Sequence, residues 1–394
     1  MKTNDNQKSS DAYRARGVSA TKDEVHAAIK TQAKGIFPGA FCKIIEDPCG
    51  DPDYCAAMHA DGAGTKSALA YIKYRETGDL SAYFDLAQDS AVMNLDDLLC
   101  IGAAGGFVMS NTIGRNAHRV GGEAIAAVIE GYQTFVDKMR NYGVDIEMSG
   151  GETADVGDLV GTLIVDSTFF VRMKRSSVID CANIRPGDVI VGLASFGKAI
   201  YEERYNAGMG SNGLTAARHL LLCSEYADKY PETYSSTIDK SMVYSGKYRL
   251  GDRLPGADVS VGDAILSPTR TYAPIIKRLI GRDGLQAMIH CTGGGQVKCR
   301  SFGKGIHYIK DNLFEMPPLF RAIAESGQIH LREMYQVFNM GHRIELYCTE
   351  EFAKFAIETA ASFGVDARII GRTEEAPDGE NRVTIKTEAG QFEY

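Results

Sequence analysis

Periodic and alternating apolar positions divide the chain into helices and strands. Apolar residues recur at 125, 128, 129, 132, 135 and 136, close to the helical period of 3.6, and predict a helix over 123–141. Further helices are predicted at 19–30, with a cap at Thr21, and at 67–76 and 86–103. Short apolar or alternating runs predict strands at 55–60, 106–111, 144–149 and 159–173.

This pattern breaks over 174–187, where charge rises and Arg185-Pro186-Gly187 predicts a turn. Beyond the break, helices are predicted at 214–223, 268–280, 318–326 and 351–363. Strands are predicted at 189–194, 285–291, 343–349 and 367–371. Polar, irregular sequence at 199–209 and 226–261 is typical of surface insertions.

We therefore expect an α/β (α+β) protein of two domains, which suits a length of 394 residues. An N-terminal arm and helix would occupy 1–50, and the first domain 51–174. The second domain would occupy 187–375, followed by a C-terminal tail at 376–394.

Charge and cysteine usage narrow the class of protein. A formal net charge of -8 argues against nucleic acid or an anionic membrane as the main partner. The nine cysteines include no C-x-x-C pair, which argues against a zinc site or a disulfide framework. No apolar run is long enough to span a membrane, and the N-terminus is polar, so we expect a cytoplasmic protein.

The loop from Asp61 to Lys66 joins a predicted strand to a predicted helix. Gly62 and Gly64 would let backbone amides approach an anion at the start of the helix. Thr65 adds a hydroxyl, Lys66 a positive charge, and Asp61 an oxygen ligand for Mg²⁺. The alternative is an ordinary glycine-rich turn, and the usual P-loop pattern is absent.

Carboxylates stand at two further places. Asp96 and Asp97 lie in an otherwise apolar helix, where they are costly unless paired or bound to a metal. Asp89 precedes Asp97 by about two helical turns and roughly shares its face. Glu152 follows Gly151 at the end of a strand. The alternatives are a solvent-facing or capping aspartate and a turn with an exposed glutamate.

Glycines also follow the predicted strand at 285–291. Thr292, Gly293, Gly294 and Gly295 could form a nest of amides for a phosphate, or a flexible linker. Cys291 is a poor candidate nucleophile, because the sequence shows no base to activate it.

A cation is predicted at the start of another helix. Ser267 fits an N-cap and Pro268 the first helical position, which would place Arg270 in the first turn. A cation there suggests an anionic ligand, and the alternative is a salt bridge to a nearby carboxylate.

Taken together and in order, these motifs resemble the aminoimidazole ribonucleotide synthetase family, also called phosphoribosylformylglycinamidine cyclo-ligase. The resemblance covers about 17–372 and includes Pro268-Thr269-Arg270 and Glu333-Met334-Tyr335 with Phe338-Asn339. It implies two α/β domains, the first closing a β-barrel with its copy in a homodimer. It also implies ATP- and Mg²⁺-dependent ring closure of formylglycinamidine ribonucleotide in purine synthesis.

The resemblance also implies residue roles. ATP would be bound by Lys30, with Lys34 as a rival, and by the residues Asp61, Gly62, Gly64, Thr65, Lys66, Asp89, Gly151 and Glu152. Asp61, Lys66 and Asp97 would be catalytic, and Asp61, Asp97 and Glu152 would hold the metal. The substrate's phosphate would lie on Thr292, Gly293, Gly294 and Gly295, with Arg270 as a further candidate.

The chain departs from the family pattern at several positions. Asp96 replaces the usual Asn, and Gly210 stands where the family has a His before Ser-Asn-Gly. The glycine-rich segment before the first strand is shortened at 37–41. The sequence after Gly295 is more basic than usual, with Lys298, Arg300 and Lys304.

Two other functions are compatible with these motifs. One is a related ATP-using enzyme: a selenophosphate synthetase, for which Cys42 is the only candidate cysteine, a thiamine monophosphate kinase, or a hydrogenase-maturation dehydratase. The last would need a C-terminal Cys, and this chain ends in Tyr394. The other is a non-catalytic ATP-binding scaffold, suggested by Gly210 in place of the His.

Overall fold

A computed structural model describes residue 28 and residues 31–394. The helix predicted at 19–30, its cap Thr21 and the candidate Lys30 lie outside the described residues. No helix within the described part is long and apolar enough to cross a membrane.

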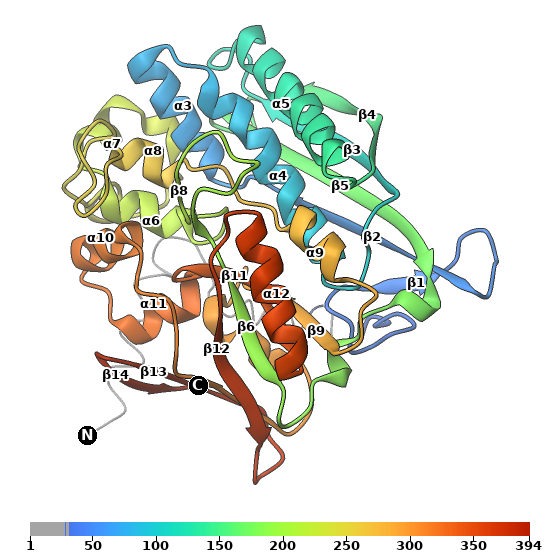
Figure 1. Cartoon of the computed structure of the whole chain (residues 1–394). Helices are drawn as coiled ribbons and strands as arrows, with labels where there is room; N and C mark the ends of the chain where they lie inside the picture. Colours follow the sequence, from blue (N-terminus) through green and yellow to red (C-terminus); the bar gives the residue numbers. More distant parts are fainter. Residues whose placement is uncertain (1–27, 29–30) are drawn as a thin grey trace.

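The first domain is a five-stranded sheet covered on one face by helices (Figure 1). Its strands follow the order β1 (Ile44–Glu46), β2 (Tyr54–Gly62), β5 (Leu163–Lys174), β3 (Phe107–Arg115) and β4 (Ile146–Asp155). The covering helices are α3 (Lys66–Thr77), α4 (Ser81–Leu99) and α5 (Gly122–Asn141). Strict alternation of buried and less buried residues along β5 turns one side chain in two toward the helices.

Helix α4 lies at the centre of the molecule. It packs on β2 and β5 of the first sheet and also contacts elements of the second domain, α9 (Ala273–Leu279) and β9 (Leu285–His290). Every residue from Asp89 to Leu99 is buried, which fits a helix enclosed on all sides. The carboxylates of α4 therefore lie at the junction of the two domains.

The second domain contains a seven-stranded sheet in the order β14-β13-β10-β12-β6-β11-β9. The strands not yet given are β6 (Val189–Ala194), β10 (Ile306–Lys310), β11 (His342–Cys348), β12 (Ala367–Glu375), β13 (Arg382–Thr387) and β14 (Gly390–Glu393). Helix α12 (Glu350–Ser362) packs on β6 and β12. The tail expected at 376–394 therefore belongs to this sheet, since β13 and β14 form one of its edges.

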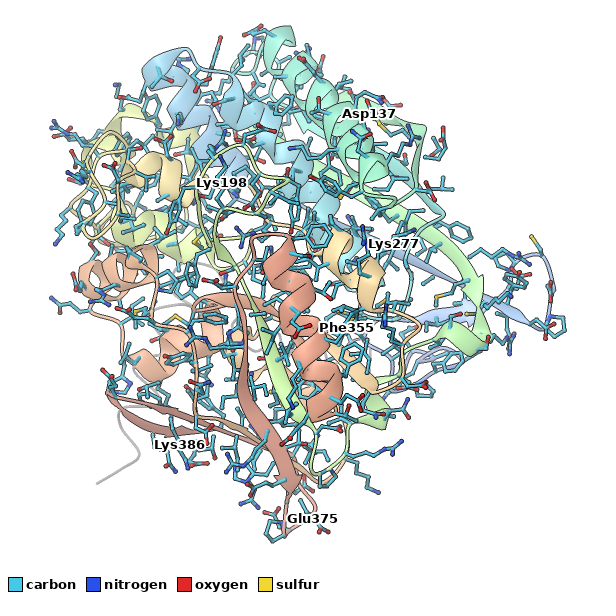
Figure 2. All side chains as sticks on the ribbon, viewed as in Figure 1. Asp137, Lys198, Lys277, Phe355, Glu375 and Lys386 are labelled. Carbon is cyan, nitrogen blue, oxygen red and sulfur yellow. The ribbon has the colours of Figure 1, made fainter. Side chains whose placement is uncertain are left out.

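Smaller helices surround this sheet. They are α6 (Leu214–Leu221), α7 (Glu225–Lys229), α8 (Val261–Ile265), α10 (Pro318–Gly327), α11 (Leu331–Val337) and the 3₁₀ segment η5 (Gly295–Ser301). Lys277 of α9, labelled in Figure 2, donates a hydrogen bond to the carbonyl of Ala104 at 3.2 Å and so links the two domains.

The helix predicted at 268–280 was wrong in its first turn, because α9 begins only at Ala273. The residues before it form an irregular segment that hydrogen-bonds to carboxylates of α4. Asp89 accepts hydrogen bonds from the amide and hydroxyl of Thr269, and Asp96 accepts one from the hydroxyl of Thr271. These tertiary contacts override the local preference of Ser267 and Pro268 for a helix start, so Arg270 lies in an irregular segment before the helix.

Candidate functional site

The carboxylate of Asp97 lies between two imidazoles. Its Oδ1 is 2.6 Å from Nδ1 of His290, and its Oδ2 is 3.1 Å from Nε2 of His59. Burial by itself would raise the pKa of Asp97, but these two hydrogen bonds outweigh burial and hold it well below its ordinary value. Asp97 is therefore a fixed negative charge at the end of α4.

Hydrogen bonding defines the protonation of His59. The amide nitrogen of Asn94 donates to the carbonyls of Asp61 and Ser167, so the amide oxygen of Asn94 faces Nδ1 of His59 at 2.9 Å. Nε2 of His59 faces Asp97, so both ring nitrogens meet acceptors. Burial by itself would lower the pKa of His59, but the hydrogen bonds that His59 donates to Asp97 and Asn94 raise it. The arrangement favours an imidazolium beside the Asp61 loop.

The second imidazole connects Asp97 to a buried arginine. Nε2 of His290 is 2.6 Å from a guanidinium nitrogen of Arg343, which can only donate, so His290 carries its proton on Nδ1. Burial, followed by the charge of Arg343, lowers the pKa of His290 to about 4. His290 is thus a neutral donor that orients Asp97.

Lys66 and Asp89 form a buried ion pair. The ammonium of Lys66 is fully buried and donates to Oδ1 of Asp89 and to the carbonyl of Ser267, each at 2.6 Å. Burial lowers the pKa of Lys66, and the charge of Asp89 acts in the opposite direction. The pair holds the segment before α9 against α4, and its ammonium does not face an open cavity.

The glycine-rich loop after β2 meets the second domain. The hydroxyls of Thr65 and Thr215 lie 2.9 Å apart, and so do those of Ser211 and Thr269. Asp61 is exposed at the end of β2. A nucleotide bound at this loop would therefore lie at the seam between the domains.

The three predicted metal ligands do not meet within one chain. Asp61 lies opposite Ser167 on the neighbouring strand β5. The hydroxyl of Ser167 contacts Ser90 of α4, so the side chains of Asp61 and Ser167 lie on the face of the sheet that the helices cover. Glu152 pairs with Thr112 on β3, and β5 and β3 separate its strand β4 from β2. Three strand spacings amount to about 14 Å. Asp61 and Asp97 share one neighbourhood through His59, whereas Glu152 is exposed elsewhere on the sheet.

The guanidinium of Arg270 is paired within the fold and is not available to an anion at the glycine loop after β9. Its guanidinium is 1% exposed and binds the carboxylate of Glu202 through two hydrogen bonds of 2.9 and 2.5 Å. It also donates to the carbonyls of Ala194 and Phe196. The guanidinium is therefore occupied by contacts within the fold. In this structure Arg270 forms a salt bridge to a nearby carboxylate, which was the alternative to binding an anionic ligand.

Lys34, the rival candidate for the ATP lysine, is exposed. The sequence analysis missed His59 and Asn94, which position Asp97. His59 stands two residues before Asp61, which places both on the same face of β2 and could have identified it. Asn94 gave no such signal, because its partners come from β2 and β5.

Comparison with known families matches almost the whole chain. Residues 41–171 match "AIR synthase related protein, N-terminal domain", and residues 185–384 match "AIR synthase related protein, C-terminal domain". The chain belongs to the AIR synthase related family. The two matches meet where the sequence pattern breaks, between β5 and β6.

Curated relatives within this family share one name, phosphoribosylformylglycinamidine cyclo-ligase. The protein from Methanothermobacter thermautotrophicus is 30% identical over 73% of this chain and 72% of its own length. That from Methanococcus vannielii is 28% identical over 82% and 79%. That from Carboxydothermus hydrogenoformans is 27% identical over 93% and 94%.

Solved structures confirm the two-domain fold of the family. A complex titled HypE-HypF has a TM-score of 0.55 at 13% identity and covers 96% of this chain and 98% of that chain. PurL of T. maritima complexed with FGAR has a TM-score of 0.58 at 14% identity, and the match spans 98% of this chain and 52% of that one.

Proposed function

We propose that this protein closes the imidazole ring of aminoimidazole ribonucleotide, using ATP and formylglycinamidine ribonucleotide. The main support is that the chain belongs to the AIR synthase related family and has cyclo-ligase relatives. The pairing of Asp97 with His290 and the contact of Thr65 with Thr215, both between the two domains, are consistent with a site at this seam. The formyl amide oxygen takes the γ-phosphoryl group and ADP leaves. The substrate's own amine then attacks the amide carbon, the carbon–oxygen bond breaks, and phosphate and a proton are released.

Such chemistry needs positioning and charge compensation more than a protein nucleophile. Thr65 and the amide of Gly64 would bind the triphosphate, and the amide of Gly62 would join them by exchanging its hydrogen bond to Oδ1 of Asp61. Asp97, oriented by His290, would stabilise positive charge on the amine as it attacks. Because attacker and electrophile belong to one molecule, holding both at the seam supplies much of the rate.

Magnesium would neutralise charge on the triphosphate when bound. Asp61 and Glu152 are exposed carboxylates of the kind that Mg²⁺ prefers. Both oxygens of Asp97 already accept hydrogen bonds, so Asp97 would become a ligand only by exchanging one of them. Asp61 also accepts a hydrogen bond, from the amide of Gly62, but it is exposed, so it fits the ion better than the buried Asp97 within one chain.

A homodimer closed through the open face of the first sheet is the second part of the proposal. Met58, Phe170 and Val108 lie in register across β2, β5 and β3, and Met58 is 64% and Val108 40% exposed. Such an apolar row is costly in water and suits a second sheet packed on it. Glu152 would then act in the site of the neighbouring subunit.

A turnover assay tests the proposed reaction. Purified protein with Mg²⁺ and ATP should release ADP only when formylglycinamidine ribonucleotide is present, with one aminoimidazole product per ADP. Asp97→Asn should lower kcat by about 100-fold or more, because the fixed charge is lost. Arg115→Gln, which alters an exposed pair with Asp155 on the sheet edge, is the matched control.

Selenide and thiamine monophosphate serve as competing substrates in the same assay. Turnover with either in place of the ribonucleotide, or nucleotide binding without any turnover, would overturn the proposal.

A further inference from the structure

The loop after β9 presents unpaired amide groups. Within the described residues, the N–H groups of Gly293 and Gly294 donate no hydrogen bond to the chain, whereas Gly295 donates to the carbonyl of Thr292 at 2.9 Å. A Cβ atom added at Gly293 would meet nothing within 4 Å, so the space above this glycine is open. Two neighbouring amides beside open space suit an anion.

A lysine lies over the same loop. The half-buried Lys298 donates from its Nζ to the hydroxyl of Thr292 at 2.5 Å. The same ammonium lies 4.7 Å from the centroid of the Phe41 ring, which itself stacks on Phe302 at 5.4 Å. The contact with the ring holds the ammonium above the loop.

Lys298 has no carboxylate within salt-bridge distance in the described part of the chain. Its two close partners, a hydroxyl and an aromatic ring, are neutral. A negative charge that acts on it is that of Asp97, whose pKa Lys298 helps to lower without a salt bridge between them. The ammonium therefore has no direct carboxylate partner and can pair with an anionic ligand.

Other candidate cations are already engaged. The guanidinium of Arg270 binds Glu202 and two carbonyls, and Lys66 is buried against Asp89. Among the described cations considered, Lys298 is the one that contacts the glycine loop, through the hydroxyl of Thr292.

We propose that Lys298, with the amides of Gly293 and Gly294, binds the phosphate monoester of the substrate. This inference rests on the proposed function and names the group that holds one end of its substrate. The ammonium neutralises the phosphate while the amides and the Thr292 hydroxyl fix its oxygens. Phe41 belongs to the segment that precedes β1. Residues from before the first strand and residues from after β9 therefore form this subsite together.

Steady-state kinetics with Lys298→Met tests the assignment. KM for formylglycinamidine ribonucleotide should rise roughly 10- to 100-fold, the loss expected for a hydrogen bond to a charged group. KM for ATP should change less than about twofold. Lys298→Arg should restore most of the affinity, and Lys304→Met, at an exposed lysine of the same segment, should behave as wild type.

A binding measurement separates this inference from the proposed reaction. Inorganic phosphate, titrated into the full chain and followed by ³¹P NMR line broadening, should bind wild type and Lys304→Met but not Lys298→Met. Equal binding by Lys298→Met overturns the inference even if no turnover is found. A rise in KM for ATP alone, an equal rise for both substrates, or no change in either also overturns it. Thermal unfolding of each variant shows whether it is folded.

Discussion

Lys310 and Glu345 are oppositely charged side chains that the fold buries completely. Lys310 donates to Glu345 and to the carbonyl of Gln296, and the hydroxyl of Tyr347 donates to Glu345 at 2.6 Å. Burial by itself would raise the pKa of Glu345, but Lys310 and His342 lower it to about 2. Every oxygen of this carboxylate therefore has a partner.

The same residues could be mistaken for a metal centre. Ligand atoms of Cys291, His342 and Glu345 lie within 4.8 Å of one another. The ammonium of Lys310 already provides the positive charge next to Glu345, and burial raises the pKa of the Cys291 thiol well above its ordinary value. We interpret the cluster as a structural ion pair in the second sheet.

Replacing Lys310 tests this interpretation. Lys310→Met should lower the free energy of unfolding by about 3–5 kcal/mol, because Glu345 loses its counterion in the interior. The exposed Lys386, labelled in Figure 2, provides the control variant Lys386→Met, which should change stability by less than about 0.5 kcal/mol. Urea unfolding at pH 7 measures both.

The pH dependence gives a second readout of the same variant. The folded pKa of Glu345 lies below its unfolded value of 4.5, so the pair stabilises the fold above that pH and is lost as pH falls toward 2. The free energy of unfolding of wild type should therefore fall between pH 4.5 and 2. In Lys310→Met this fall should be much smaller, because the pair is already absent. An unchanged acid slope together with a loss below about 1 kcal/mol would contradict the assignment.

At the scale of elements, the glycine loop after β9 packs against the segment at the C-terminal end of α11. Gly295 has a φ of +53°, and a Cβ there would lie 2.6 Å from the carbonyl oxygen of Tyr335 and 2.7 Å from that of Phe338. The glycine loop and the Tyr335–Phe338 segment are about forty residues apart in sequence and pack directly against each other. This contact gives a physical reason for their joint presence.

Gly295→Ala should therefore destabilise the protein by about 1–3 kcal/mol, since both the backbone conformation and the close contact exclude a methyl group. Gly293→Ala is the matched control, because its added methyl group would meet open space and should leave stability nearly unchanged. Thermal unfolding of the two variants decides: equal losses would show that the loop does not rest on the segment as described.

At the scale of the whole molecule, α4 joins the two domains. The proposed homodimer would form through the open face of the first sheet. Asp89 and Asp96 bind residues 269–271 of the second domain, so the domains are held at a fixed seam. Glu152 lies on β4, away from this seam. In the proposed homodimer, a complete site needs Glu152 from the neighbouring subunit.

Subunit mixing tests this arrangement. Asp61→Ala and Glu152→Ala should each be inactive alone, but hybrid dimers contain one site with both wild-type residues. Unfolding and refolding an equal mixture should thus restore up to about a quarter of wild-type activity. Sedimentation should show a dimer that Val108→Lys dissociates, while Ile129→Lys, at an exposed position on α5, should not. A monomer, or no activity in the mixture, would refute the arrangement.

The sequence by itself determined the local elements of the first domain and the family. Periodicity predicted α5 almost to the residue, because this signal depends on neighbours in the chain. The order of the Asp61 loop, Asp97 and the Thr292–Gly295 loop carried the resemblance that the comparisons confirmed.

Only the tertiary structure decided which cations are paired with carboxylates inside the fold. Lys66 and Arg270 look alike in sequence to cations that bind phosphate, yet both are buried against carboxylates, whereas Lys298 is not. The late start of α9 and the strands of the C-terminal segment likewise depend on partners far away in the chain. A side chain's partners come from other elements, and a local pattern does not contain them.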